Sequence, residues 1–197
     1  MKKLITAIVI LAVAGLQSLK AQSTTAANGI YLTENDYKTG KPAYTLGNHD
    51  SMRLNEFLAG KNIDVVYQGK KMKFSKSGIF GYRLNNQDFR FYSNDAYRII
   101  DTAGFVLYER EKLTQHGKGL MPVEHYFYSV NSNHPVLDLT IANLWNSFPG
   151  SPDFRYSLQN YFHKDEELRS FDQATNQYEI KHLYFEHKNT IASQRAM

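Results

Sequence analysis

The sequence predicts an α+β fold in which an antiparallel β meander is followed by a small helical segment. Between Lys71 and Glu109, short aromatic-rich runs are separated by turn residues about every 8 to 12 positions, the spacing of antiparallel sheets. Beyond residue 130, apolar residues recur at steps of three or four, as in amphipathic helices. We therefore expect a curled sheet or partly closed barrel of about six to eight strands, followed by about two to four helices.

The expected strands are rich in β-branched and aromatic residues and are bounded by turn residues. They cover 29–33, 63–67, 71–74, 78–83, 89–92, 97–100, 105–109 and 123–130, and 43–46 could form a further strand as partner of the first. Gly81 lies inside one of them and predicts a bulge, a bend or the close approach of another backbone. Residues 113–120 are polar and contain two glycines, so we expect a loop there. Met52, Leu54, Phe57 and Leu58 fit either a loop or one or two helical turns that end at Gly60.

Helical spacing defines the C-terminal third. The expected buried positions of the first two helices are Leu137, Ile141, Leu144, Trp145 and Phe148, and then Phe154, Leu158, Tyr161 and Phe162. Ser151 and Pro152 suit the N-cap and first position of the second helix. Asp165 is expected to cap a short helix through Leu168 and Phe171, and Tyr178, Ile180 and Leu183 belong to a final helix.

The N-terminus has the pattern of a secretory signal peptide. Lys2 and Lys3 precede an apolar run from residue 4 to 16, and Ala21 is a small residue at a suitable cleavage position. The predicted organisation is therefore a signal peptide at 1–21, a flexible lead-in at 22–28, a β-rich core at 29–130 and C-terminal helices at 131–197, which pack on the same domain. We expect an exported protein, periplasmic or extracellular, that is soluble after cleavage.

Charge and composition exclude several classes of function. The predicted signal contains Lys2, Lys3 and Lys20 and no acidic residue, so its removal lowers the net charge from +4 to +1. A nearly neutral chain has no electrostatic basis for binding nucleic acid. The chain has no cysteine, which excludes disulfides and thiol chemistry. No later apolar run reaches the length of a membrane span. No cofactor is expected, since no nucleotide-binding motif occurs and Gly117-Lys118-Gly119 lacks the spacing and context of a phosphate loop.

Residues of types that catalyse reactions are present, but no sequence motif groups them. The seven histidines (49, 116, 125, 134, 163, 182 and 187) form no ligand motif, and His182 with Glu186 is interpreted as a solvated helical pair. His49-Asp50-Ser51 resembles part of a triad, but no G-x-S-x-G elbow occurs. Carboxylates that could pair for glycoside cleavage lie in or beside strands: Asp64, Asp88, Asp101, Glu109 and Glu124. We expect each of them to cap a turn or to lie on a solvated strand.

Three further features could belong to a binding surface. Lysines are densest at Lys70, Lys71, Lys73 and Lys76, a pattern that predicts a charged edge strand and leaves a polyanion or headgroup contact open. The aromatic residues, including Trp145, are expected mainly in the core. Arg83, Arg90 and Arg98 lie on successive expected strands and could be neighbours, depending on register.

Several blocks together resemble a group of uncharacterised exported proteins of Bacteroidetes-type bacteria. They are LKAQ at the end of the signal, GIYLTENDYKTGKPAY, GIFGYR, FRFYSNDAYRI, GFVLY, YFYS and LTIANLWNSFPGSPDF. The resemblance spans nearly all of the chain after the signal. It implies an exported β-rich domain with a helical C-terminus, and it implies no reaction, ligand or catalytic residue.

The sequence thus favours a non-catalytic extracytoplasmic binding module whose partner is an envelope protein or a glycan. The alternatives are a small envelope hydrolase with carboxylate or histidine chemistry and a structural subunit of an envelope assembly. A hydrolase predicts a pocket in which at least two of the named carboxylates or histidines converge. A binding module predicts an exposed apolar patch or an unpaired sheet edge.

Overall fold

The computed structural model describes residues 26–55, 60–117 and 119–195, and it is an α+β fold of antiparallel sheets and four α-helices. The predicted signal peptide at 1–21, the first part of the lead-in, and Phe57 and Leu58 lie outside the described residues. No helix in the described ranges is long and apolar enough to cross a membrane.

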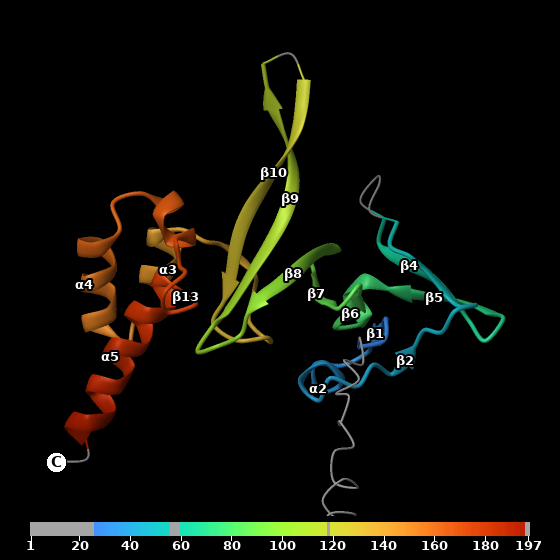
Figure 1. Cartoon of the computed structure of the whole chain (residues 1–197), viewed down its shortest axis with the longest axis horizontal. Coiled ribbons are helices and arrows are strands. Elements are labelled where there is room, and N and C mark those ends of the chain that lie inside the picture. Colours follow the sequence, from blue (N-terminus) through green and yellow to red (C-terminus); the bar gives the residue numbers. More distant parts are fainter. Residues whose placement is uncertain (1–25, 56–59, 118, 196–197) are drawn as a thin grey trace, which may run out of the picture.

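The strands form three sheets (Figure 1). The largest has the order β11-β10-β9-β8-β7-β6-β1-β2, the second is β3-β4-β5 and the third is β12-β13. The strand bounds are β1 Gly29–Tyr31, β2 Tyr44–Thr45, β3 Ser51–Arg53, β4 Asn62–Tyr67, β5 Lys70–Ser75, β6 Gly81–Leu84, β7 Gln87–Tyr92, β8 Asp95–Asp101, β9 Val106–His116, β10 Gly119–Ser129, β11 Leu137–Asp138, β12 Phe171–Asp172 and β13 Gln177–Tyr178. The α-helices are α2 Glu34–Lys38, α3 Ile141–Ser147, α4 Pro152–Tyr161 and α5 Glu179–Arg195, and the 3-10 turns are η1 Lys76–Gly78 and η2 Asp165–Arg169.

The expected α+β class is confirmed, whereas the expected closure and strand number are wrong. In the described part of the chain β11 and β2 are the two edges of an open eight-stranded sheet, and the three sheets together contain more strands than expected. The additional strands are short or lie in segments whose polar residues predicted loops. Met52 is in a strand, as is Phe171, and Leu137 belongs to β11 rather than to the first helix.

Two-residue turns produce the meander. Both central residues have positive φ at Gln68-Gly69, Asn85-Asn86 and Ser93-Asn94, and each pair joins two antiparallel strands. Positive φ at both positions matches the twist of a tight hairpin, and Asn and Gly adopt it at low cost. Gly81 has the close backbone approach that the sequence predicted, because a Cβ added there would lie 1.9 Å from the carbonyl oxygen of Phe89.

Helix α2 is a feature that the sequence analysis missed. Thr33 accepts a hydrogen bond from the Asp36 backbone N–H, and the Asp36 carboxylate accepts one from the Thr33 backbone N–H. This capping box initiates a helix between the expected strands at 29–33 and 43–46, where the sequence pattern predicted no helix.

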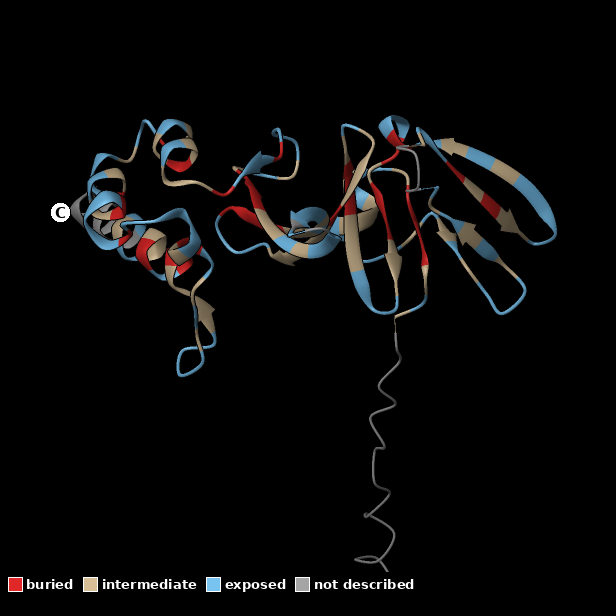
Figure 2. Cartoon of the chain, turned by 90° about the horizontal axis from the view of Figure 1, so that it is seen from above, coloured by how far each residue is buried: buried red, intermediate tan, exposed pale blue. Residues whose placement is uncertain are grey.

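The core consists of three apolar clusters spread along the molecule (Figure 2). The first packs α3, α4, α5 and η2 against the base of β9 and β10, with Phe105, Leu107 and Tyr128 on the sheet side. The second fills the space between the β3-β4-β5 sheet and the β1-β6-β7 end of the large sheet. The third includes Tyr97 and Tyr108 on strands β8 and β9. The buried residues therefore lie where the C-terminal helices pack on β9 and β10, where the β3-β4-β5 sheet packs on β1, β6 and β7, and on β8 and β9 between these regions.

Two buried cations cross-link these regions. Lys181 of α5 has no exposed surface and donates hydrogen bonds to the backbone carbonyls of Ala103 and Phe105, with Asp101 3.5 Å away. Because burial disfavours the charged form, the pKa of Lys181 is lowered to about 8, although Asp101 opposes the shift. Arg90 is the second of these cations and lies in strand β7.

Candidate functional site

Strands β9 and β10 continue well past the rest of the sheet. In the described residues β8 pairs with β9 only as far as Glu109, and β11 pairs with β10 at Phe127 and Tyr128. From the Arg110–His125 pair to the His116–Gly119 pair, the two strands pair only with each other. We call this ribbon, residues 110–125, the arm. It projects from the middle of the molecule in Figure 1.

The outer part of the arm is the segment 113–120, which the sequence predicted to be a loop. Its residues are polar or exposed on both faces, so they lack the alternation that identifies a half-buried strand. The ladder with β10 nevertheless continues to His116, and Gly117 with positive φ lies at the turn. The prediction was therefore wrong because a ribbon that is solvated on both faces has no apolar periodicity.

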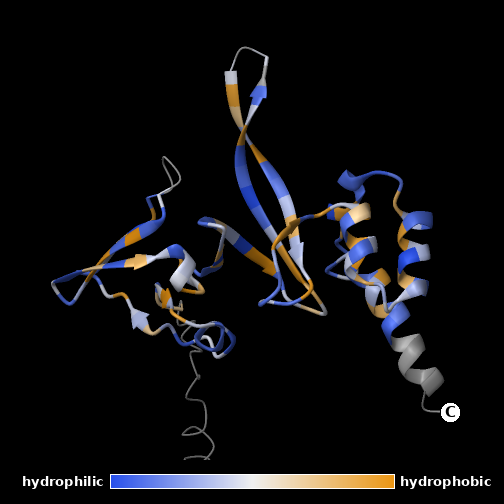
Figure 3. Cartoon of the chain, turned by 180° about the vertical axis from the view of Figure 1, so that it is seen from behind, coloured by the Kyte–Doolittle hydropathy of each residue, from blue (hydrophilic) through white to orange (hydrophobic). Residues whose placement is uncertain are grey.

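Large aliphatic side chains are exposed on this arm. Leu113, Leu120 and Met121 are 69%, 61% and 54% exposed, and Figure 3 shows the hydrophobic segments near the end of the arm. An isolated two-stranded ribbon is at best marginally stable in water, and large exposed apolar side chains make no stabilising contact until a partner covers them. The arm therefore carries exposed apolar side chains on a ribbon that has little packing of its own.

The two faces of the arm differ in chemistry. Residues directly opposite each other on paired strands share a face, so Glu111 and Glu124 face the same side, and the next pair on that side is Leu113 with Pro122. Opposed like charges destabilise a ribbon unless a cation lies between them. This face thus carries two carboxylates next to an aliphatic end.

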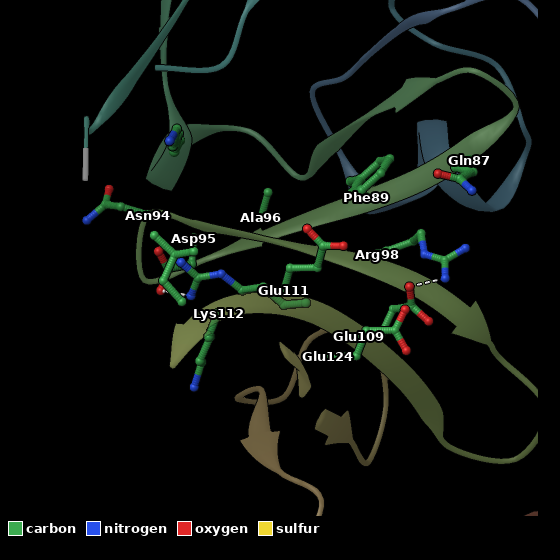
Figure 4. A pocket seen from close by; sticks show the side chains of 13 residues that line it. Gln87, Phe89, Asn94, Asp95, Ala96, Arg98, Glu109, Glu111, Lys112 and Glu124 are labelled. Atoms are coloured by element: carbon green, nitrogen blue, oxygen red, sulfur yellow. Dashed lines mark hydrogen bonds and ion pairs between the residues drawn. The ribbon is translucent and has the colours of Figure 1, made fainter. Parts of the chain in front are cut away.

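A groove of about 850 Å³ lies at the base of the arm (Figure 4). It lies over β7, β8, β9 and β10, and its lining residues are Lys76, Gln87, Phe89, Asn94, Asp95, Ala96, Arg98, Glu109, Arg110, Glu111, Lys112, Leu113 and Glu124. Arg98 forms an ion pair with Glu109, and Arg110 forms one with Asp95 at 2.5 Å. Charges of both signs therefore line the groove, and two ion pairs fix its floor.

Of the five carboxylates proposed from sequence, Glu109 and Glu124 line this groove together. Asp64 lies on the β3-β4-β5 sheet, 3.7 Å from the amine of Lys73, and Asp101 contacts Lys181. Glu111 also lines the groove, and the sequence analysis missed it. The signal that could have identified it was its opposition to Glu124 across a hairpin, which the expected loop concealed.

Asp88, another of the five carboxylates, is bound by side chains of two neighbouring strands and lies outside the groove. It accepts two hydrogen bonds from the Arg83 guanidinium at 2.7 and 2.8 Å and one from the Tyr31 hydroxyl at 2.8 Å. Burial, followed by this hydrogen bond to Asp88, raises the pKa of Tyr31. Asp88 therefore holds β1 and β6 to β7 and is separate from the groove carboxylates.

Among the histidines and the triad-like tripeptide, His182 and Asp50 have structural partners. His182 lies 3.1 Å from Glu186 on the exposed side of α5, as expected for a solvated helical pair. Asp50 accepts hydrogen bonds from the backbone N–H groups of Gly47 and Gln68, which lower its pKa and fix a turn. No group of three or more metal-binding side chains occurs in the described residues.

The three arginines do not form a common site, because they have separate partners. Arg98 pairs with Glu109 in the groove, whereas Arg83 pairs with Asp88. Arg90 donates to the Tyr108 hydroxyl, to Ser129 Oγ and to the His134 carbonyl. The register places Arg83 and Arg90 on one face of the sheet and Arg98 on the other.

The lysine-rich segment forms an edge strand, as the sequence predicted. Strand β5 is at the edge of the β3-β4-β5 sheet, and Lys70, Lys71 and Lys73 are exposed. Lys76 differs from the prediction: it is buried, and its amine lies 5.7 Å from the centre of the Phe91 ring. The exposed cationic surface therefore ends at Lys73.

Two aromatic residues are less buried than predicted. Tyr161 is mainly exposed, and Trp145 is half-buried. The Arg155 guanidinium lies 4.1 Å from the centre of the Trp145 ring, and Tyr156 meets that ring edge-on. These side chains cover the outside of the α3–α4 pair rather than its core.

Comparison with known proteins gives no relative: no family model, no curated protein and no solved structure matches this chain.

Proposed function

We propose that this chain is an exported, non-catalytic interaction module that docks on a protein surface through the arm. The observation that carries the proposal is the exposure of Leu113, Leu120 and Met121 on a two-stranded ribbon that projects from the sheet. Export rests on the signal pattern at 1–21.

The chemistry of the arm favours a protein partner over a glycan. Sugar rings are bound by flat aromatic side chains, whereas the large apolar residues exposed on the arm are aliphatic. Aliphatic side chains contribute by being removed from water, at roughly 25 cal/mol per Å² of apolar surface buried. Covering them requires a partner with an apolar surface of its own.

The docking surface is a face of the arm rather than its outer edge. Pro122 lies on β10 and has no backbone N–H, and proline in sheets is confined to positions where that donor is not needed. A proline on an edge strand discourages the addition of another strand. Side chains of the arm, with Leu113 next to Pro122, therefore carry the contact.

The test is site-specific photo-crosslinking in the producing cell. A photoreactive residue at Leu120 is expected to capture a protein, whereas the same residue at the exposed Tyr156 of α4 is the matched control. The variant L113S/L120S/M121S should fold normally, since these side chains make no core contact, and should abolish the crosslink that a probe at Gln115, which lies opposite Leu120 on the docking face, gives. Equal crosslinking by the triple variant and the native arm would reject the proposal.

A hydrolase is the second candidate, because Glu109 and Glu124 line one groove together with Glu111. The exposure of Glu111 and Glu124 opposes it, since a general acid needs the desolvation that raises the pKa of a carboxyl group. Assays of the purified chain on chromogenic glycosides and on cell-wall material, with E109Q and E124Q as variants, decide between the candidates. Hydrolysis that both variants lose would establish the enzyme.

A further inference from the structure

The arm and the β3-β4-β5 sheet have complementary surfaces. On the arm, Glu111 and Glu124 oppose each other, and Leu113 and Pro122 follow on the same face. The Cβ atoms of directly opposed residues lie about 5 Å apart, so the two negative charges repel each other, and cations that approach this face relieve the repulsion. The surface that fits this face is therefore cationic around an apolar centre.

The outer face of the β3-β4-β5 sheet has this composition. Its inner face is covered, because Ile63 and Val65 are buried in the second core cluster. The register places Arg53 and Lys73 beside Asp64 and places Lys71 beside Val66 on the opposite, outer face.

A shallow hollow of about 410 Å³ lies on that outer face. Val66 and the side chains of Arg53, Lys71 and Lys73 line it on this face, whereas Val65 and Met72, which also border it, are paired with each other and pack in the second core cluster on the inner side. Asp64 is the acidic residue of this lining, and it is held by Lys73 at 3.7 Å and by the Asn55 side-chain amide at 2.8 Å. The hollow thus combines an apolar floor with an excess of positive charge at its rim.

We propose that the arm of one copy of this chain docks in the hollow of a second copy, with Leu113 over the apolar floor and Glu111 and Glu124 against Lys71 and Arg53. The proposal rests on the function proposed above and names the partner surface. In Figures 1 and 3 the arm and the β4–β5 hairpin stand apart within one chain, so the contact forms between copies.

The contact is heterologous, because the surface that donates differs from the surface that accepts. When two copies are joined, one keeps a free hollow and the other a free arm, so further copies can add, and such contacts build open chains unless the geometry closes a ring. The ionic part of the contact weakens as salt screens exposed charges, since the Debye length falls from about 30 Å at 0.01 M salt to about 3 Å at 1 M.

Sedimentation velocity on the chain without residues 1–21 tests the inference through a charge exchange. The native chain is expected to associate as its concentration rises, and more strongly at low salt. E111K/E124K and R53E/K71E should each sediment as monomers when alone. Their equal mixture should associate again, because the native acidic arm of R53E/K71E meets the native basic hollow of E111K/E124K, and the basic arm of E111K/E124K meets the acidic hollow of R53E/K71E.

The control variant K41E/E166K changes two exposed charges elsewhere and should associate as the native chain does. Circular dichroism establishes that all variants are folded. A native chain that stays monomeric at every concentration, or a mixture that fails to associate, overturns the inference. If the native chain is monomeric while the Leu120 probe still captures another protein, the second-copy inference fails and the proposed function stands.

Discussion

Lys181 makes the stability of this protein depend on pH in an unusual direction. Its amine has no exposed surface, and burial lowers its pKa from 10.5 to about 8. In this interval the unfolded chain binds a proton that the folded chain has released, so the free energy of unfolding rises with pH. Integration of the difference between pH 7 and 9.5 gives a gain of about 2 kcal/mol. The window ends there because tyrosines begin to titrate above it.

The assay is urea unfolding at several pH values between 7 and 9.5, with the native chain, K181M and K41M. Methionine keeps the packing on the Phe105 ring, which lies 3.9 Å from the Lys181 amine, and removes the titrating group. K181M should lose the rise of about 2 kcal/mol, whereas K41M, at an exposed lysine, should retain it. A native chain whose stability is flat over this range, or a K181M variant with the native slope, would refute the reasoning.

Two further substitutions test the large sheet. G81A should lower the free energy of unfolding by about 1–3 kcal/mol, because the added Cβ would lie 1.9 Å from the Phe89 carbonyl oxygen. The control G119A, whose Cβ would meet no atom within 4 Å, should change it little, and thermal melts of the two variants compare them. R90M should lower the free energy of unfolding by about 1–3 kcal/mol, since the substitution removes the donor to the Tyr108 hydroxyl and to the His134 carbonyl; denaturant unfolding measures the loss, and a native midpoint would contradict it.

The meander was predictable because its signals are local. Asn85-Asn86 and Ser93-Asn94 supply the positive φ that tight turns need, and the aromatic runs between them alternate between the faces of the sheet. The close backbone approach at Gly81 could also be predicted, because a glycine inside a strand usually marks a bulge, a bend or a site where another backbone comes near.

The errors occur where tertiary contacts decide the structure. Leu137 has helical spacing with the residues that follow, yet it pairs with Tyr128 in a two-residue edge strand. Tyr161 lies at the end of α4, where the buried face of the helix gives way to solvent. Spacing identifies which residues share a helical face, but it does not say where another element covers that face.

The candidate site was beyond sequence reasoning for a related reason. Glu109 and Glu124 were named as carboxylates near strands, but their neighbour Glu111 and the exposed leucines became visible only with the hairpin register. A ribbon solvated on both faces looks like a loop in sequence. The residues most relevant to docking therefore lie where the apolar pattern fails, which is expected where function overrides local rules.

The base of the arm explains how so exposed a ribbon can present a defined surface. Arg98 with Glu109 and Arg110 with Asp95 tie β9 to β8, and the Lys112 amine lies 4.6 Å from the centre of the Phe127 ring. These partly exposed contacts are individually worth about 1 kcal/mol or less, but together they restrict the hinge at which the arm leaves the sheet. A ribbon fixed at its base has less conformational entropy to lose in the proposed docking, so the ion pairs of the groove would contribute to affinity without touching the partner.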